Sequence, residues 1–171
     1  SEFEDNSWIS MTNPTTEELF SVSSTYKIAP DDLRASLDEE ERSRIEIEEY
    51  YSLILVDIPT IEERNGKDWY GTIPLAIIIC DKVIVTVCLE DSPVLTAFMD
   101  GRVRNFYTHM KTRFIFQILY RNATLYLNYL RIIDRRSDAI EQKLHEATKN
   151  RELIELLELE KSLVFFTTSL K

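Results

Sequence analysis

Residues 105–147 contain neither proline nor glycine. Because these two residues most often interrupt or end a helix, the stretch predicts either one long helix that extends beyond a compact core or two helices placed end to end. The next break is expected at 148–150, with Asn150 as a candidate N-cap. Beyond it, apolar residues recur at spacings of three and four, the pattern of a helix-packing seam. The members of this seam are Leu156, Leu159, Leu163, Phe166 and Leu170. The simplest outcome is two long antiparallel helices.

Before this region the chain favours strands. Residues 8–11, 44–58, 69–80 and 82–89 are rich in β-branched and aromatic side chains, and we expect Pro59 to end the second strand. Residues 62–68 read as a polar loop, and Pro74 indicates a bulge or an edge position. Two helices are expected between the first strands, one over 13–23 and one from Pro30 to about 38–41, each with acidic residues in its first turn.

The two cysteines bear on the register of a predicted hairpin. If Asp81 and Lys82 form a two-residue turn, position 88 pairs with position 75, and Cys80 and Cys88 then point to opposite faces of the sheet. A disulfide between them is therefore not expected, which favours a reducing compartment.

Together these elements predict an α/β fold. We expect an α/β/α layered domain with a mixed sheet of four or more strands, followed by an antiparallel pair of long helices. The expected division is an α/β domain at 1–104 and a helical hairpin at 105–171.

Composition and motifs exclude several functions. The formal net charge of -10 disfavours binding to nucleic acid. The longest uncharged stretch near the strands, 70–80, is far shorter than the roughly 20 apolar residues of a membrane helix. The glycines are scattered, and the only histidines, His109 and His145, are not spaced as a metal pair. No acid–base pair suggests catalysis, so we do not expect an enzyme.

The richest polar feature is the acidic stretch 31–49. If the helix after Pro30 is regular, Asp31, Ala35 and Asp38 lie along one face. Hard cations such as Mg²⁺ take oxygen ligands and often keep several waters, so Asp31 and Asp38 could hold a hydrated ion, particularly with a third ligand from a second subunit. From the pattern alone, a solvated acidic surface is the alternative.

The segment 102–136 is basic and carries several aromatic residues. A basic helix can contact phosphates or lipid headgroups. The simpler interpretation is that it complements the acidic half of the chain and that most of its aromatic residues pack in a core or an interface.

The ordered set of apolar segments resembles CorA-type magnesium transporters over nearly the whole chain. The sheet core of the family is similar to YYSLILVDIP at 50–59, TIPLAIII at 72–79 and VIVTV at 83–87. Its helical region is similar to LYRNA at 119–123, YLNYL at 126–130, NRELIELL at 150–157 and LEKSL at 159–163.

The resemblance implies a homopentamer in the cell membrane. Each subunit would have a cytosolic α/β domain, a long stalk helix and two C-terminal membrane helices, with a Gly-Met-Asn signature after the first. The resemblance further implies that ions bound between cytosolic domains hold the pore closed. One carboxylate of that regulatory site would come from the helix after Pro30, where the matching position is Ala35, flanked by Asp31 and Asp38.

The chain begins at Ser1 and stops at Lys171 inside a helical pattern. We therefore expect a truncated protein. The resemblance implies that it is the cytosolic part of a transporter, without the Gly-Met-Asn signature and both membrane helices, and so unable to transport ions by itself and monomeric or a low oligomer alone. The expected function is metal sensing and gating in a Mg²⁺ or Co²⁺ transporter. The alternatives are a zinc-transporting branch of the family and a soluble interaction module without an ion role.

Overall fold

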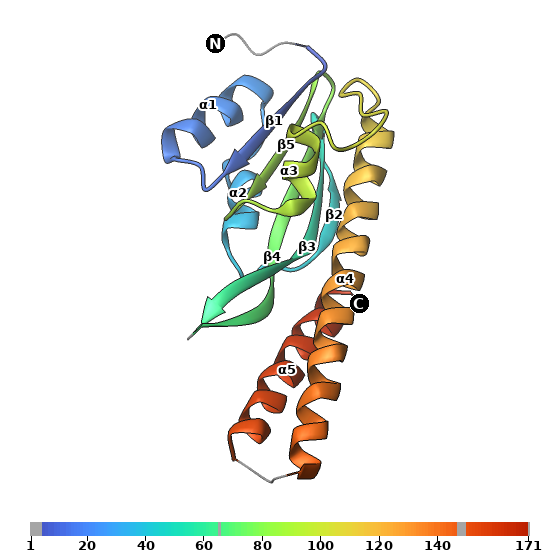
Figure 1. Cartoon of the computed structure of the whole chain (residues 1–171). Coiled ribbons are helices and arrows are strands. Elements are labelled where there is room, and N and C mark those ends of the chain that lie inside the picture. Colours follow the sequence, from blue (N-terminus) through green and yellow to red (C-terminus); the bar gives the residue numbers. More distant parts are fainter. Residues whose placement is uncertain (1–4, 65, 147–149, 171) are drawn as a thin grey trace. The chain divides into compact units, whose positions relative to one another are not determined.

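The computed structural model describes residues 5–64, 66–146 and 150–170, and Figure 1 traces the chain through them. Its contacts divide the chain into two compact units, each built from two separate stretches. Unit 1 consists of Ser1–Ile58 and Ile73–Tyr120, and unit 2 consists of Pro59–Thr72 and Arg121–Lys171.

A mixed five-stranded sheet has the order β1-β5-β4-β3-β2. Its strands are β1 (Ser7–Thr12), β2 (Arg44–Ile47), β3 (Tyr51–Arg64), β4 (Lys67–Cys80) and β5 (Val83–Cys88). β1 runs parallel to β5, whereas β2–β3 and β4–β5 are antiparallel pairs. Leu75 pairs with Cys88, so the register predicted from the Asp81-Lys82 turn is confirmed and the two cysteines point to opposite faces.

Two details of the predicted strands are wrong. The expected strand 44–58 is two strands joined by a tight turn, in which the Glu48 N–H donates to the Tyr51 carbonyl at 2.9 Å. Pro59 does not end β3, and the expected polar loop 62–68 is largely strand. Pro59 and Pro74 lie beyond the paired registers of β2 with β3 and of β4 with β5, so neither proline removes a donor from those ladders.

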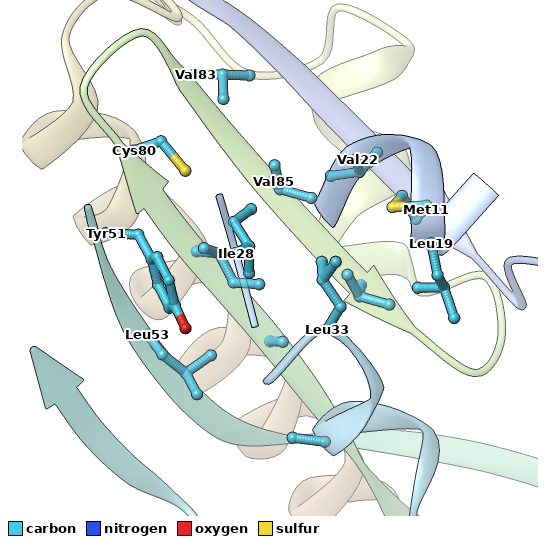
Figure 2. Packing of buried hydrophobic residues seen from close by; sticks show 14 of the residues in the cluster. Met11, Leu19, Val22, Ile28, Leu33, Tyr51, Leu53, Cys80, Val83 and Val85 are labelled. Atoms are coloured by element: carbon cyan, nitrogen blue, oxygen red, sulfur yellow. The ribbon is translucent and has the colours of Figure 1, made fainter. Parts of the chain in front are cut away.

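Helices cover both faces of the sheet in unit 1. α1 (Thr16–Tyr26) and α2 (Pro30–Arg34) bury their apolar residues against one face, in the core cluster that Figure 2 shows around Leu33, Leu53 and Val85. On the other face Trp8 contacts Phe98 of α3 (Pro93–Met99) and Phe114 of α4 (Lys111–Glu146) edge-on, at ring-centroid distances of 6.1 and 5.1 Å. The layered α/β/α architecture is thus confirmed.

A capping box begins α1. The Thr15 hydroxyl accepts from the Glu18 N–H at 3.2 Å, and the Glu18 carboxylate accepts from the Thr15 N–H at 2.8 Å. We expect Thr15→Ala to lower the free energy of unfolding by about 1 kcal/mol, because it leaves a helix N–H without its partner. Urea denaturation measures the change, and Thr16→Ala, one residue into the helix, is the matched control. Equal stability of the two variants would contradict the capping role.

The long proline-free stretch forms one helix rather than two, since α4 runs unbroken over Lys111–Glu146. It begins later than residue 105, because Asn105 adopts a left-handed φ of 54°, a conformation that asparagine tolerates but a helix does not. α5 (Asn150–Ser169) follows, and within unit 2 it packs antiparallel on α4 (Figure 1). The predicted break at 148–150 lies mostly outside the described residues.

The core of unit 2 joins the two helices to the outer part of β4. Its buried members are Tyr70, Tyr126, Ile133, Ile140, Leu159 and Phe166. The predicted seam of α5 is only partly right: Leu159 and Phe166 are buried, but Leu163 and Leu170 are exposed. Ser162, only 1% exposed, occupies the buried stripe instead, and its hydroxyl donates to the Glu158 carbonyl at 3.3 Å.

Candidate functional site

The two predicted metal ligands lie on either side of a helix end. α2 ends at Arg34, a single 3-10 turn (Ala35–Leu37) follows, and Asp38 has extended backbone angles of φ -106° and ψ 113°. The expectation of one regular helix through Asp38 is therefore wrong. Asp38 Oδ1 accepts from the Glu40 N–H at 3.0 Å, a local turn that competes with continuation of the helix. Both Asp31 and Asp38 are exposed, as an ion-binding role requires.

Ala35, the position matched to the family's regulatory carboxylate, is not at the surface. It is 7% exposed and belongs to the core cluster that contains Leu33. A charged side chain there would be removed from water without a partner, at a large cost. The packing therefore favours a small apolar residue at 35, and a regulatory ion in this protein needs other ligands.

Sequence analysis missed the role of Asp32. The Tyr51 hydroxyl donates to Asp32 Oδ2 and accepts from the Ala29 N–H at 3.2 Å. Burial and then the hydrogen bond to Asp32 raise the pKa of Tyr51 to about 12. This network ties the start of α2 to β3, so Asp32 serves the fold and is a poorer candidate ligand than Asp31. The sequence signal that pointed to Asp32 was its position as an acidic residue in the first turn of a helix.

The rest of the acidic stretch is partly neutralised. Arg44 pairs with Glu41 at 2.6 Å and with Glu46 at 2.7 Å. No group of three or more His, Cys, Asp or Glu residues is arranged to hold a metal ion anywhere in 5–64, 66–146 or 150–170. Within one chain the residues therefore do not form a complete metal centre, and Asp31 and Asp38 could contribute only to a hydrated or shared site.

The basic segment divides into core and surface. Phe114 and Tyr126 are buried, whereas Phe116 and Tyr120 are exposed. Arg102 pairs locally with Asp100 at 2.5 Å. The interpretation as core packing thus holds for some of these aromatic residues and not for the rest.

Both cysteine thiols are buried, and burial raises the pKa of each to about 11. Folding therefore favours the neutral thiols, and the stability that they contribute is complete below pH 9 and lost as pH rises through about 11. We expect the free energy of unfolding to fall across this range, measured by urea denaturation. In Cys88→Ala the free energy of unfolding should fall less steeply with pH. An unchanged slope would contradict the assignment of this pH dependence to the Cys88 thiol.

A pocket of about 450 Å³ in unit 2 is a second candidate site. Arg64, Lys67, Asp68 and Trp69 from the ends of β3 and β4 form one wall. Arg136 of α4 and one face of α5 form the others. This pocket was not predicted from the sequence, because residues 62–68 were expected to form a loop. Lys67 pairs with Glu155 at 3.0 Å, and Arg136 lies 3.9 Å from an oxygen of Asp68.

Comparison with known proteins identifies the family. Residues 3–171 match the family described as CorA-like Mg²⁺ transporter protein. The cobalt/magnesium transport protein CorA of Methanocaldococcus jannaschii is 30% identical over 172 residues, which cover 95% of this chain and 51% of that protein. The chain thus spans about half the length of this curated relative.

Solved structures agree with the sequence match. The soluble domain of CorA from Methanocaldococcus jannaschii has a TM-score of 0.83 at 26% identity, covering 95% of this chain and 65% of that chain. The ZntB cytoplasmic domain from Vibrio parahaemolyticus has a TM-score of 0.61, covering 87% of this chain and 62% of that one, and at 10% identity it shows a shared fold alone.

No helix in the described part of the chain is both long and apolar enough to cross a bilayer. The fold of the chain is similar to that of the CorA soluble domain. The match to the family extends over almost every residue, and we conclude that this chain belongs to the CorA-like Mg²⁺ transporter family.

Proposed function

We propose that residues 1–171 form the cytosolic metal-sensing and gating domain of a divalent cation transporter. The observation that carries the proposal is the match of 95% of the chain to the soluble domain of CorA, a protein named for cobalt and magnesium transport. The transported ions in this proposal are Mg²⁺ and Co²⁺, with Zn²⁺ as the alternative. The full-length protein would be a homopentamer in the cell membrane, with this domain on the cytoplasmic side.

The proposed sensing site uses Asp31 and Asp38. Both carboxylates are exposed, Asp31 in the first turn of α2 and Asp38 just after the 3-10 turn, and Mg²⁺ favours oxygen ligands while retaining much of its water shell. Because one chain does not supply a third ligand in the described residues, the site is proposed to be completed by water or by a second subunit. Such a weakly built site suits an affinity of about 10⁻⁴–10⁻³ M, in the range where a sensor responds to millimolar ion.

Calorimetric titration with MgCl₂ and CoCl₂ tests the site. The chain is expected to bind in the millimolar range, and Asp31→Ala combined with Asp38→Ala is expected to weaken binding by about tenfold or more. The matched control is Asp134→Ala with Asp138→Ala, which removes two exposed carboxylates from one face of α4. Equal weakening by both pairs would show that net charge, and not this site, attracts the ion.

A further inference from the structure

The pocket in unit 2 has charged side chains around its rim and two buried residues of α5, Leu159 and Ser162, at its floor. Glu155, Glu158, Leu159 and Ser162 lie on one face of α5, at spacings of three and four residues. Leu159 and Ser162 are buried, and the Ser162 hydroxyl is already bonded to the helix backbone, so the floor offers no free polar group. Recognition at this pocket therefore depends on the rim.

The rim carries both positive and negative side chains. Arg64, Lys67, Arg136 and Lys161 line it together with Asp68, Glu155 and Glu158. Two of the four cations are held in ion pairs, Arg64 with Glu62 at 2.6 Å and Lys67 with Glu155 at 3.0 Å, so attraction of a small anion depends on Arg136 and Lys161.

Two of the cations are available to a ligand. Lys161 forms no ion pair with any residue that the structure describes. Among the described residues, Arg136 makes only long polar contacts, 3.9 Å to the Asp68 carboxylate and 3.4 Å to the Asp68 carbonyl. The guanidinium N–H groups of Arg136 are therefore able to donate to a phosphate, whose oxygens match the planar guanidinium geometry.

Trp69 adds an aromatic surface to the same pocket. The indole is half-buried, and the Arg64 guanidinium lies 4.8 Å from its ring centroid. The guanidinium lies over one face of the indole, and a planar ring can stack on the outer face of the guanidinium or on the uncovered part of the indole. The pocket lining thus contains two available cations, Arg136 and Lys161, and the aromatic side chain of Trp69.

We propose that this pocket binds a small organic phosphate that carries a planar ring, the chemistry of a nucleotide. The phosphates contact Arg136 and Lys161, and the ring lies against Trp69 and Arg64. The volume of about 450 Å³ lies within the range of small-molecule sites. The pocket residues are remote in sequence from Asp31 and Asp38, and ligand binding at the pocket does not depend on the proposed ion role.

Calorimetric titration of residues 1–171 with ATP, tripolyphosphate and adenosine, in buffer without divalent cations, tests the proposal. ATP is expected to bind more tightly than either of its parts. Arg136→Gln and Lys161→Glu should each weaken ATP binding by about tenfold or more, because each removes a charge-assisted contact. Trp69→Ala should weaken ATP binding and leave tripolyphosphate binding unchanged.

Arg131→Gln and Lys143→Glu are the matched controls, because both residues are exposed on α4 and do not line the pocket. They should bind ATP as the wild type does. Lys161 is exposed, so its substitution tests the pocket even if Arg136→Gln unfolds unit 2. Absence of ATP binding, or equal binding by pocket and control variants, would overturn the proposal. Tripolyphosphate binding as tightly as ATP would overturn the role of the ring.

Discussion

Phe114→Ala is expected to lower the free energy of unfolding of unit 1 by about 3–5 kcal/mol. The Phe114 ring is fully buried and contacts three other rings, those of Trp8, Phe98 and Phe106, at centroid distances of 5.1, 5.0 and 4.7 Å. Alanine would remove the central ring of this cluster and leave a cavity that the rigid rings around it cannot fill.

Urea denaturation followed by tryptophan fluorescence measures this loss, since Trp8 lies in the cluster. The matched control is Phe116→Ala, two residues along α4, where the ring is 66% exposed. That variant should change the free energy of unfolding by less than about 1 kcal/mol. Similar losses in the two variants would contradict the orientation of α4 against the sheet of unit 1.

Phe166→Ala should destabilise unit 2 by a similar amount, about 3–5 kcal/mol. The Phe166 ring is buried, meets Tyr126 edge-on at 5.1 Å, and belongs to the cluster that joins α4, α5 and the start of β4. Few other large side chains hold α5 in this core, so the loss should appear as early fraying of α5. Amide hydrogen exchange along α5, measured by mass spectrometry, detects it.

Phe165→Ala is the control, because the neighbouring ring is 49% exposed. We expect exchange in α5 of that variant to match the wild type. Phe166→Ala also tests the division of the chain into two units. It should accelerate amide exchange in unit 2 more than in unit 1. Uniform acceleration through both units would indicate a single cooperative structure.

Much of the fold could be predicted because its signals are local. Runs of Ile and Val at 75–79 and 83–87 dictate buried strands, and the two-residue Asp81-Lys82 connection fixes their register. The absence of proline and glycine after residue 101 likewise leaves helix as the dominant option. Each of these inferences needs only a few neighbouring residues.

The errors arose where the turn signal was weak or was overlooked. The β2–β3 turn contains Glu48, Glu49 and Tyr50, none of which is a strong turn former, so two strands read as one. The Asn65-Gly66 dipeptide is a strong hairpin signal, and Gly66 adopts a left-handed φ of 73°, yet the polar residues around it suggested a loop.

The candidate sites depend on tertiary contacts that no local pattern encodes. Ala35 is buried in the core cluster between the helices and the sheet of unit 1, and the pairing of Asp32 with Tyr51 joins residues 19 apart. The pocket of unit 2 brings together two strand ends and two helices. The sequence therefore indicates that Asp31 and Asp38 are exposed acidic residues, but it does not give their positions relative to one another.

In the proposed function, this domain makes a transporter respond to the ion that it carries. The direct test is Mg²⁺ flux through the full-length protein in liposomes, as Mg²⁺ is raised on the side that bears residues 1–171. Flux is expected to fall in the millimolar range. Asp31→Ala with Asp38→Ala should shift this fall to higher Mg²⁺, whereas Asp134→Ala with Asp138→Ala should not. Flux that stays constant as Mg²⁺ rises on that side would contradict the proposed function.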